Sequence, residues 1–573
     1  MQRFNLLDEA WIPVITEGEG TRDVSLKELF AGAHTITGLA GDTKTQDFAL
    51  FRLLLAVLHT VFSRYDARGK VYESIELDAQ GMQREEVAKE DDDYGKDLKK
   101  TWMTLWEQGC FPAKVNDYLE TWRDRFYLYD DTYPFFQVRA ADMAADKINK
   151  TKASEISGKN IDRRISESRN KIALFSPKYE AHNNKEILSD KEIARWLITY
   201  QGYTGLADKV IFGTDKYKAS KGWLFDIGGI RLVGDNLFES LLLNCALLHP
   251  EEAYYGKVQR PCWEYAGSDV IAHRFRTNRI YNLAELYTNW SRAIYIDPER
   301  DFSGGFSFDI VKLPEIDHAD PFLELMSLWR YQASGELKDR FTPRKHRQNE
   351  AIWRSFGLLT LSYDEVEKNR KYRQRKPGIM QWLNTIREHT DRTLAVEAIS
   401  MQDDGNATSW VPVDEIYDAL HIRDAVLTDV EEAGWVPRIN DVVNETKQVI
   451  GWTYKNFIAQ IHEIRNSSSK QFVQQNVEEL YFLVDQPFRD WIASIQPNDK
   501  KDARVLAWQA TLKGIVLRQA EKIIREAGPR DYIGIEKEEK TVNIATAYNQ
   551  FVFFVKRQLD PKKGGESIDT NAK

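Results

Sequence analysis

The sequence predicts an α+β protein in which a mixed α/β N-terminal domain, residues 1–422, is followed by an all-α C-terminal four-helix bundle, residues 423–560. The first part alternates helical apolar patterns with short β-like runs, which is typical of a mixed domain. The second part contains four long amphipathic segments with short connectors, which bury their apolar faces most simply in an antiparallel bundle. Residues 561–573 are polar and rich in Lys and Gly, so we expect a disordered tail.

The first residues predict a strand and then helices. Phe4–Val14 alternates apolar and polar residues and contains a proline, which favours an edge strand. Thr45–Ser63, Leu98–Trp106 and Val115–Phe126 have apolar residues at helical spacing. The acidic stretch Glu85–Asp97 is interpreted as a solvated loop or a helix start.

The middle of the chain combines basic loops with helices and strands. Asp146–Lys171 has eight Lys/Arg and few large apolar residues, so we expect a mobile basic loop. Asp190–Tyr203 predicts a helix, Ala207–Gly222 a second basic loop, and Gly234–Leu248 another helix. Between Arg279 and Ser362 the runs AIYI, DIVKL and LLTLS predict short strands.

Four segments carry the helical pattern of the C-terminal part, and they are separated at 466–469, 497–499 and 528–529 by residues typical of turns. They are Asn440–Ile464, Val477–Ile495, Asp502–Ala527 and Thr541–Gln558.

Composition restricts the class of protein. A length of 573 residues corresponds to about two to four domains. Because the net charge is only −9, a polyanion would have to bind to local basic patches. The three cysteines are isolated, so we expect buried thiols and no disulfide framework or zinc module. No signal peptide and no run of about 18 apolar residues is seen, which favours a cytoplasmic protein without a membrane span.

No catalytic motif is present. The sequence lacks GxSxG, GxxxxGK[ST], HExxH and a Gly-rich dinucleotide loop after a strand, and its ten histidines are scattered singly. Asp91–Asp93 and Asp403–Asp404 are conceivable metal carboxylates, but neither has an accompanying histidine. We therefore expect a protein that is not an enzyme and that needs no cofactor and no metal.

Two basic segments with interleaved aromatics indicate nucleic-acid binding. Arg340–Lys376 contains eleven Lys/Arg and four Asp/Glu, and such a segment can neutralise several phosphates. A solvated loop whose cationic stems cover apolar surface is the alternative. Within it, Phe341–Glu350 is predicted to place cationic and amide side chains at a hairpin or loop tip.

The second segment, Phe212–Gly222, has three lysines around Tyr217, and its small residues would allow the backbone to approach a nucleic-acid groove. An exposed lysine loop without a ligand is the alternative interpretation.

Several segments together resemble the CasA-type large subunit of the type I-E Cascade CRISPR surveillance complex. The resemblance runs from residue 1 to the helical part, in the order of the family. It rests on FNLLDEAWIPV at the start, FYLYDDTYPFFQV (126–138), GDNLFESLLLN (234–244), PCWEY (261–265), LYTNWSRAIYI (286–296) and ISMQDDGNATSWVPVDEIYDAL (399–420).

The resemblance implies the same two-part fold and a function without catalysis. A subunit of this kind recognises the protospacer-adjacent motif in double-stranded DNA, promotes target unwinding and R-loop formation, and provides a docking surface for a helicase-nuclease. The guide RNA supplies sequence reading by base pairing, so the protein reads only a short duplex element. Implied partners are the CRISPR RNA, the double-stranded target and displaced strand, the recruited helicase-nuclease, and other Cascade subunits, namely the small-subunit dimer and the backbone and 5′-handle-binding subunits.

The resemblance also implies site residues. The motif-reading loop falls on Phe212–Gly222, where the family's run of glycines is interrupted, and its candidates are Gly213, Thr214, Asp215, Lys216, Lys218 and Lys221. The wedge that opens the duplex falls on Phe341–Trp353, with Arg344, Lys345, Arg347, Gln348 and Asn349 as candidates. A loop near the 5′ end of the guide contributes Asn170, Lys171, Phe175 and Lys178.

A basic face on the bundle is a candidate path for the displaced strand, with a solvated helix face as the alternative. Its residues are Lys455, Lys513, Arg518, Lys522 and Arg525. Two rival functions remain at this level. A metal-dependent nuclease or other helical-bundle enzyme would act on nucleic acid, and a structural scaffold would show no salt-dependent affinity for DNA.

Overall fold

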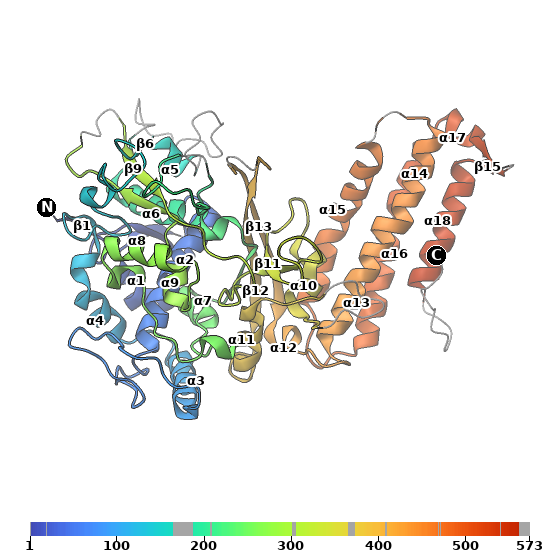
Figure 1. Ribbon diagram of the computed structural model, residues 1–573. Coiled ribbons are helices and arrows are strands. Elements are labelled where there is room, and N and C mark those ends of the chain that lie inside the picture. The colour runs from blue at the N-terminus through green and yellow to red at the C-terminus, as the bar shows by residue number, and fades with distance from the viewer. Residues whose placement is uncertain are drawn as a thin grey trace. The chain divides into compact units, whose positions relative to one another are not determined.

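The computed structural model describes residues 2–18, 20–163, 165, 187–206, 209–300, 305–364, 373–406, 410–467, 469, 471–538 and 540–560. The chain divides into two compact units. Unit 1 contains residues 1–349, 362–389 and 395–419, and unit 2 contains residues 350–361, 390–394 and 420–573. Both helices and strands are present, which confirms the predicted mixture of the two (Figure 1).

Within its described residues, unit 1 contains small sheets in place of one large sheet. The strand orders are β3-β2-β4, β6-β9-β8, β13-β12-β7, β1-β5 and β10-β11. The strands are β1 (Arg3–Asn5), β2 (Ile12–Thr16), β3 (Thr21–Val24), β4 (Ile36–Leu39), β5 (Tyr127–Tyr129), β6 (Ser154–Ser157), β7 (Gly229–Val233), β8 (Arg292–Tyr295), β9 (Ser307–Lys312), β10 (Leu328–Tyr331), β11 (Phe341–Arg344), β12 (Thr393–Asp403) and β13 (Pro412–Arg423). The outer ends of β12 and β13, Thr393–Leu394 and Leu420–Arg423, belong to unit 2.

The helices of unit 1 are α1 (Leu26–Gly32), α2 (Lys44–Phe62), α3 (Asp92–Gln108), α4 (Lys114–Thr121), α5 (Lys159–Asp162), α6 (Asp190–Tyr203), α7 (Leu237–Asn244), α8 (Gly267–Arg276), α9 (Leu283–Tyr287) and α11 (Gly378–Ile386). Short 3₁₀ turns occur at η1 (Ala33–Thr35), η2 (Arg123–Arg125), η3 (Ala140–Met143), η5 (Trp223–Phe225), η6 (Glu252–Tyr254), η7 (Cys262–Glu264) and η9 (Arg387–His389).

Helix α2 lies in the core of unit 1. It packs against α4, α6, α7 and α9. Its length and composition would suit a membrane span, which the sequence analysis did not anticipate, but its apolar window is entirely buried inside the protein. Thr43 caps its start by accepting a hydrogen bond from the Gln46 amide. The long apolar sequence of α2 is therefore explained by the neighbours that surround this helix inside the protein.

The predicted edge strand at Phe4–Val14 is wrong. Two strands, β1 and β2, occupy this region, and β2 lies in the middle of its sheet. A proline is tolerated there because β2 pairs with β4 only from Val14 onward, so the missing amide hydrogen of Pro13 breaks no assigned ladder bond.

Two further expectations need correction. The basic segment Asp146–Lys171, expected to be a loop, contributes β6, which pairs with β9, and the short helix α5. Buried Ile156 and Ile161 anchor these elements. The segment has too few apolar residues to give a clear periodic signal in the sequence. The run LLTLS, expected to be a strand, lies largely in the helix α10 (Phe356–Thr360), because Phe356 and Leu359 are buried at helical spacing.

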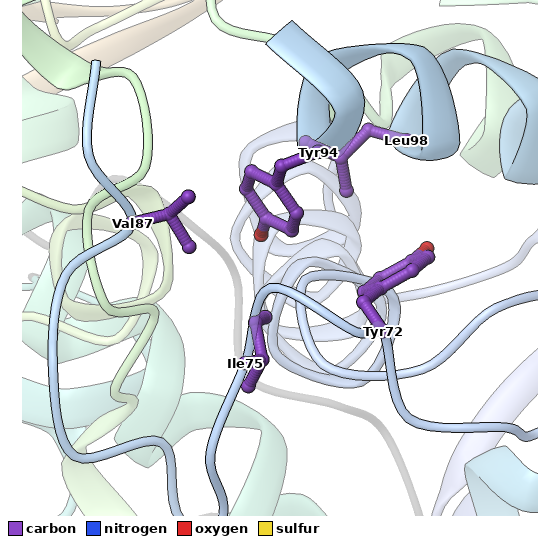
Figure 2. Close-up of a cluster of buried hydrophobic side chains, with 5 residues drawn as sticks. All are labelled: Tyr72, Ile75, Val87, Tyr94 and Leu98. Carbon is purple, nitrogen blue, oxygen red and sulfur yellow. The ribbon is translucent and has the colours of Figure 1, made fainter. Parts of the chain in front are cut away.

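A small apolar cluster fixes the long connection between α2 and α3. Figure 2 shows Tyr94 and Leu98 of α3 beside Tyr72, Ile75 and Val87 of the connection. The rings of Tyr72 and Tyr94 meet edge to face with centroids 5.6 Å apart. The start of α3 is capped by Asp91, which confirms that the acidic stretch contains a helix start.

Two of the three cysteines are buried, as expected. Burial raises the pKa of the Cys262 thiol to about 12 and also raises the pKa of Cys245. Cys110 is exposed instead, because α3 ends at the left-handed residue Gly109 and the chain leaves the helix there.

Two histidines, the buried His59 and the partly buried His249, line a cavity of about 30 Å³ in unit 1. His59 lies in α2, and its Nε2 atom is buried without a hydrogen-bond partner. His249 accepts a hydrogen bond on Nδ1 from the Glu251 amide. Burial lowers the pKa of His59 to about 3 and that of His249 to about 4.

These histidines predict that mild acid destabilises unit 1. Their pKa values in the folded protein lie below the ordinary value of 6.5, so the unfolded chain binds more protons as pH falls. We expect the free energy of unfolding to fall by about 2 kcal/mol for both together between pH 6.5 and 5.5. Urea unfolding at the two pH values measures this loss, and His59→Phe should reduce it. The exposed His421 offers a control, since His421→Gln should leave the loss unchanged. Equal stability at both pH values would contradict the prediction.

Unit 2 consists mainly of long helices, which correspond to the segments expected from their periodicity (Figure 1). Contacts join α14 to α15 and α18, and α16 to α15 and α18. The elements are η8 (Ile352–Ser355), α10, α12 (Asp424–Leu427), α13 (Trp435–Gln448), the π-helical segment η10 (Val449–Tyr454), α14 (Lys455–Ile464), α15 (Gln471–Ala493), α16 (Lys501–Arg525), α17 (Pro529–Ile533), the hairpin β14 (Ile535–Lys537) and β15 (Lys540–Val542), and α18 (Ile544–Leu559).

Aromatic side chains form the core of unit 2 near η8. The Trp353 ring stacks on Phe488 with centroids 4.2 Å apart, and Trp508 meets Phe488 edge to face. Trp353 Nε1 donates a hydrogen bond to Asp485. These contacts explain why a short segment distant in sequence, residues 350–361, belongs to unit 2.

Candidate nucleic-acid interface

A buried ion pair supports the end of the predicted motif loop. Both guanidinium nitrogens of Arg52 in α2 lie 2.8 Å from the carboxylate oxygens of Glu324, and Trp223 Nε1 donates a hydrogen bond to the same carboxylate over 2.6 Å. Burial alone would raise the pKa of Glu324, but the charge of Arg52 lowers it. Trp223 directly follows the loop, so the core of unit 1 fixes where the loop ends.

The motif loop, residues 212–222, lies beside β9 and the residues that follow it. The Tyr217 hydroxyl accepts a hydrogen bond from the Phe212 amide and donates one to the Lys312 carbonyl over 2.6 Å. The Ser220 amide donates to the Leu313 carbonyl. Burial raises the pKa of Tyr217 to about 12, so it remains protonated and can donate. The loop is therefore attached at several points although it contains no regular strand.

The two glycines of the loop serve different purposes. Gly213 has φ +63° and open space where a Cβ atom would lie, so a ligand can approach its Cα closely, although its amide donates a hydrogen bond to the Lys147 carbonyl. A Cβ atom on Gly222 would lie 2.1 Å from the Gly202 carbonyl oxygen in α6. The small size of Gly222 is required by packing inside the protein.

The three lysines of the loop differ in their surroundings. Lys216 is exposed, as are Thr214 and Asp215. Lys218 pairs with Glu315 at 2.5 Å, and Lys221 pairs with Asp226 at 2.6 Å. Both carboxylates also face His318, at 3.7 and 3.2 Å. Burial alone would raise the pKa of Asp226, but the hydrogen bond from His318 and the charge of Lys221 lower it to about 2.

The predicted wedge is not at a hairpin tip. The connection between β10 and β11 is formed by residues 332–340, so Arg344 is the last residue of β11 and Lys345 follows the hairpin. Their backbone runs against Gly228, where a Cβ atom would lie 2.3 Å from the Arg344 carbonyl oxygen. The charged residues and the proline of this segment had suggested a hairpin tip. Its packing against the start of β7 depends on the tertiary structure, which a charge pattern does not reveal.

The remaining wedge candidates lie on the surface at the end of this segment. Arg347, Gln348 and Asn349 are exposed. Gln348 Nε2 donates a hydrogen bond to Asp414 of β13 over 2.9 Å, and Asn349 has a left-handed backbone with φ +59°. The amide of Gln348 is accessible once this single surface hydrogen bond opens.

The motif loop and the wedge segment meet at the Phe225 ring. Lys345 Nζ lies 3.8 Å from the ring centroid and Lys221 Nζ lies 5.5 Å from it. Lys221 also lies 4.6 Å from the centroid of Trp410. Lys345 pairs with Asp403 at 2.6 Å, and burial lowers the pKa of Lys345. Phe225 is fully buried, so three segments distant in sequence meet around this ring inside unit 1.

The aromatic and acidic residues at this meeting point were not predicted from the sequence. Phe225 and Trp410 lie in segments without a charge cluster, and Asp403 was considered only as a metal ligand. The exposed lysines of the motif loop, Lys216 and Lys218, suit phosphate contacts. The one available signal was that Trp410 follows shortly after the acidic pair 403–404.

The guide-end candidates Asn170, Lys171, Phe175 and Lys178 lie outside the described residues. Their assignment remains a prediction.

The bundle candidates do not share one surface. Arg518, Lys522 and Arg525 lie within one face of α16 by helical spacing, whereas Lys513 points to α18, where it pairs with Asp560. Lys522 pairs with Glu479 at 3.2 Å and Arg525 with Glu521 at 3.6 Å. Lys455 lies on α14.

No group of three or more His, Cys, Asp or Glu side chains that could hold a metal ion is found in the described part of the chain. Asp91 is occupied as the cap of α3, and Asp403 as the partner of Lys345. The arrangement therefore offers exposed cations for a polyanion, and one carboxylate from each of the two runs considered as metal ligands, Asp91 and Asp403, has a structural partner.

Comparisons with known proteins agree on one family. The family model of the CRISPR-associated protein Cse1 matches residues 5–519. The CRISPR-associated protein CasA/Cse1 of Thermus thermophilus is 28% identical over 371 residues, which cover 63% of this chain. The match spans 60% of the length of that relative.

Solved structures share the fold. Cse1 of Thermobifida fusca matches with a TM-score of 0.75 and 23% identity, over 97% of this chain and 98% of the other. A chain from a CRISPR RNA-guided surveillance complex matches with a TM-score of 0.62 and 15% identity, over 97% of this chain and 100% of the other.

Proposed function

Because the chain belongs to the CRISPR-associated Cse1 family, whose model matches residues 5–519, we propose that it is the large subunit of an RNA-guided CRISPR surveillance complex of the Cascade type. In this role it recognises the protospacer-adjacent motif in double-stranded DNA, promotes unwinding and R-loop formation, and provides a docking surface for the helicase-nuclease. Other Cascade subunits and the CRISPR RNA are its partners in the cytoplasm. The similarity to a chain of a surveillance complex supports this proposal.

The meeting of the motif loop and the wedge segment at Phe225 is the observation that carries the proposal. Lys216 and Gly213 of the motif loop are exposed, and so are Gln348 and Asn349 of the wedge segment. One region can therefore contact a short duplex element and the base step beside it, while the guide RNA reads the remaining sequence.

Unit 2 has a separate role in this proposal. We propose that α13–α14, α15, α16 and α18 form the antiparallel four-helix bundle, because contacts connect α14, α15, α16 and α18 in a closed ring. The bundle contacts neighbouring subunits, and Arg518, Lys522 and Arg525 lie along the path of the displaced strand. The guide-end residues Lys171 and Lys178 contact the CRISPR RNA.

The test is binding of target duplexes by the guide-loaded complex, with and without this subunit, using a library randomised beside the target. Adding the subunit should create a preference for a short flanking motif. Affinity without any preference would reduce the subunit to an electrostatic clamp or scaffold. Cleavage of DNA by the subunit alone in the presence of Mg²⁺ would instead support the nuclease alternative.

The wedge assignment predicts a selective defect in duplex opening. Gln348→Ala combined with Asn349→Ala should slow target opening about tenfold while binding to pre-opened DNA is retained. A fluorescent base analogue in the target reports opening. Gln80→Ala is the control, since Gln80 is an exposed amide in the turn 78–82. An equal loss on intact and pre-opened DNA would remove the wedge assignment.

A further inference from the structure

The C-terminal end of α8 supports the motif loop. The Phe275 ring meets the Tyr217 ring edge to face with centroids 5.2 Å apart, and it meets Phe212 in the same way at 6.1 Å. Both partners lie in the loop, and the Tyr217 hydroxyl is fixed to the backbone of the loop and of β9. The loop therefore rests on Phe275 through two aromatic contacts.

Phe275 is nevertheless 47% exposed. A large apolar ring beside a basic loop thus remains open to solvent on one side. Its neighbour Arg276 is exposed as well. The end of α8 and the motif loop thus present a continuous surface.

Three arginines lie at or just after this end of α8, and they are held differently. Arg274 is buried and donates to the Pro314 carbonyl, which anchors the helix end to the residues after β9. Arg279 pairs with Asp317 at 3.0 Å. For Arg276 no ion pair is found within the described residues. Of the three arginines, Arg276 is available to an external anion.

We propose that the end of α8 is a second arm of the DNA surface, in which Arg276 contacts a phosphate of the duplex next to the motif and Phe275 positions the motif loop. The partner is the sugar-phosphate backbone of double-stranded DNA. The inference rests on the proposed function, because it places the flanking backbone beside the loop that reads the motif. The segment HRFRTNR (273–279) contains three arginines and no acidic residue, which suits a backbone contact.

The two residues have different roles. A planar guanidinium binds phosphate oxygens through paired hydrogen bonds and releases counterions from the DNA, so its contribution is independent of sequence and sensitive to salt. Phe275 carries no charge, so it acts through the position of Tyr217 and Phe212. Loss of Phe275 should change motif preference and leave the salt dependence unchanged.

The first experiment measures DNA affinity of the guide-loaded complex over a series of salt concentrations. Arg276→Gln should weaken binding about five- to tenfold near 0.1 M salt for all motifs, and lower the slope of log affinity against log salt by about 0.9. Arg68→Gln is the matched control, since Arg68 is an exposed arginine of unit 1 in the turn after α2. An unchanged slope with Arg276→Gln would overturn the contact.

The second experiment repeats the motif library with Phe275→Ala and Phe275→Tyr. The alanine variant should lose motif preference, and the tyrosine variant, which keeps the ring, should retain it. Thermal unfolding checks that the alanine variant is folded. Retained preference with alanine would overturn the positioning role. If the wild-type complex shows no motif preference, the proposed function fails, whereas failure of the variants alone removes only the inference about α8.

Discussion

Glu324→Ala is expected to lower the free energy of unfolding by about 3–5 kcal/mol, because it leaves the buried guanidinium of Arg52 without a counter-charge. Both side chains are almost fully buried, and the pair is joined by two hydrogen bonds of 2.8 Å. Trp223 also loses its acceptor. Since Trp223 directly follows the motif loop, motif-dependent DNA binding should fall with stability. Urea unfolding and the motif library measure the two effects.

Two variants test whether the charge is the cause. Glu315→Ala removes the partner of Lys218, whose side chain is 82% exposed, so a loss below about 1 kcal/mol is expected. Arg52→Met combined with Glu324→Leu removes both charges and should recover most of the stability lost by Glu324→Ala. If the double variant is as unstable as the single one, packing and the Trp223 bond explain the loss, and the ion-pair argument is wrong.

Sequence patterns predicted elements whose signals are local. Helix α6 begins and ends at the predicted residues, Asp190 and Tyr203, because Ser189 and Glu192 form a capping box before an apolar run. The C-terminal helices were found because their apolar residues repeat over many turns. Strands β6 and β2 were missed or misplaced, because a short strand in a small sheet is defined by its partner and not by its own residues.

The same distinction applies to the candidate site. Lys216, Lys218 and Lys221 could be proposed from charge alone, since cations cluster in one short segment. Their partners could not be predicted, because Phe225 and Trp410 reach Lys221 only in the folded protein. Lys345 illustrates the opposite error: a lysine in a basic run was expected at a tip, but it is largely buried against Phe225 and paired with Asp403.

Gly222→Ala is the second variant with a large expected effect, because steric contact alone decides it. Gly222 has φ −59° and ψ 138°, a conformation that alanine adopts freely, so no backbone strain is introduced. The new Cβ atom would lie 2.1 Å from the Gly202 carbonyl oxygen and 2.5 Å from the Tyr203 amide nitrogen, and backbone atoms cannot rotate away. We expect a loss of about 3 kcal/mol in the free energy of unfolding. The loop should also separate from α6, which removes motif preference.

Gly213→Asn is the matched change at the other end of the same loop. Gly213 has φ +63°, which asparagine tolerates better than other residues, and no atom lies within 4 Å of the position that a Cβ atom would take there. Its stability should change by less than about 1 kcal/mol, so any loss of motif preference would report contact between DNA and the open backbone of the loop. Gly222→Ala with wild-type stability would show that α6 does not fix the loop. A third outcome is that Gly222→Ala loses motif preference while Gly213→Asn keeps it in full. The loop would then have to be correctly placed, and its lysines, rather than the backbone at Gly213, would read the motif.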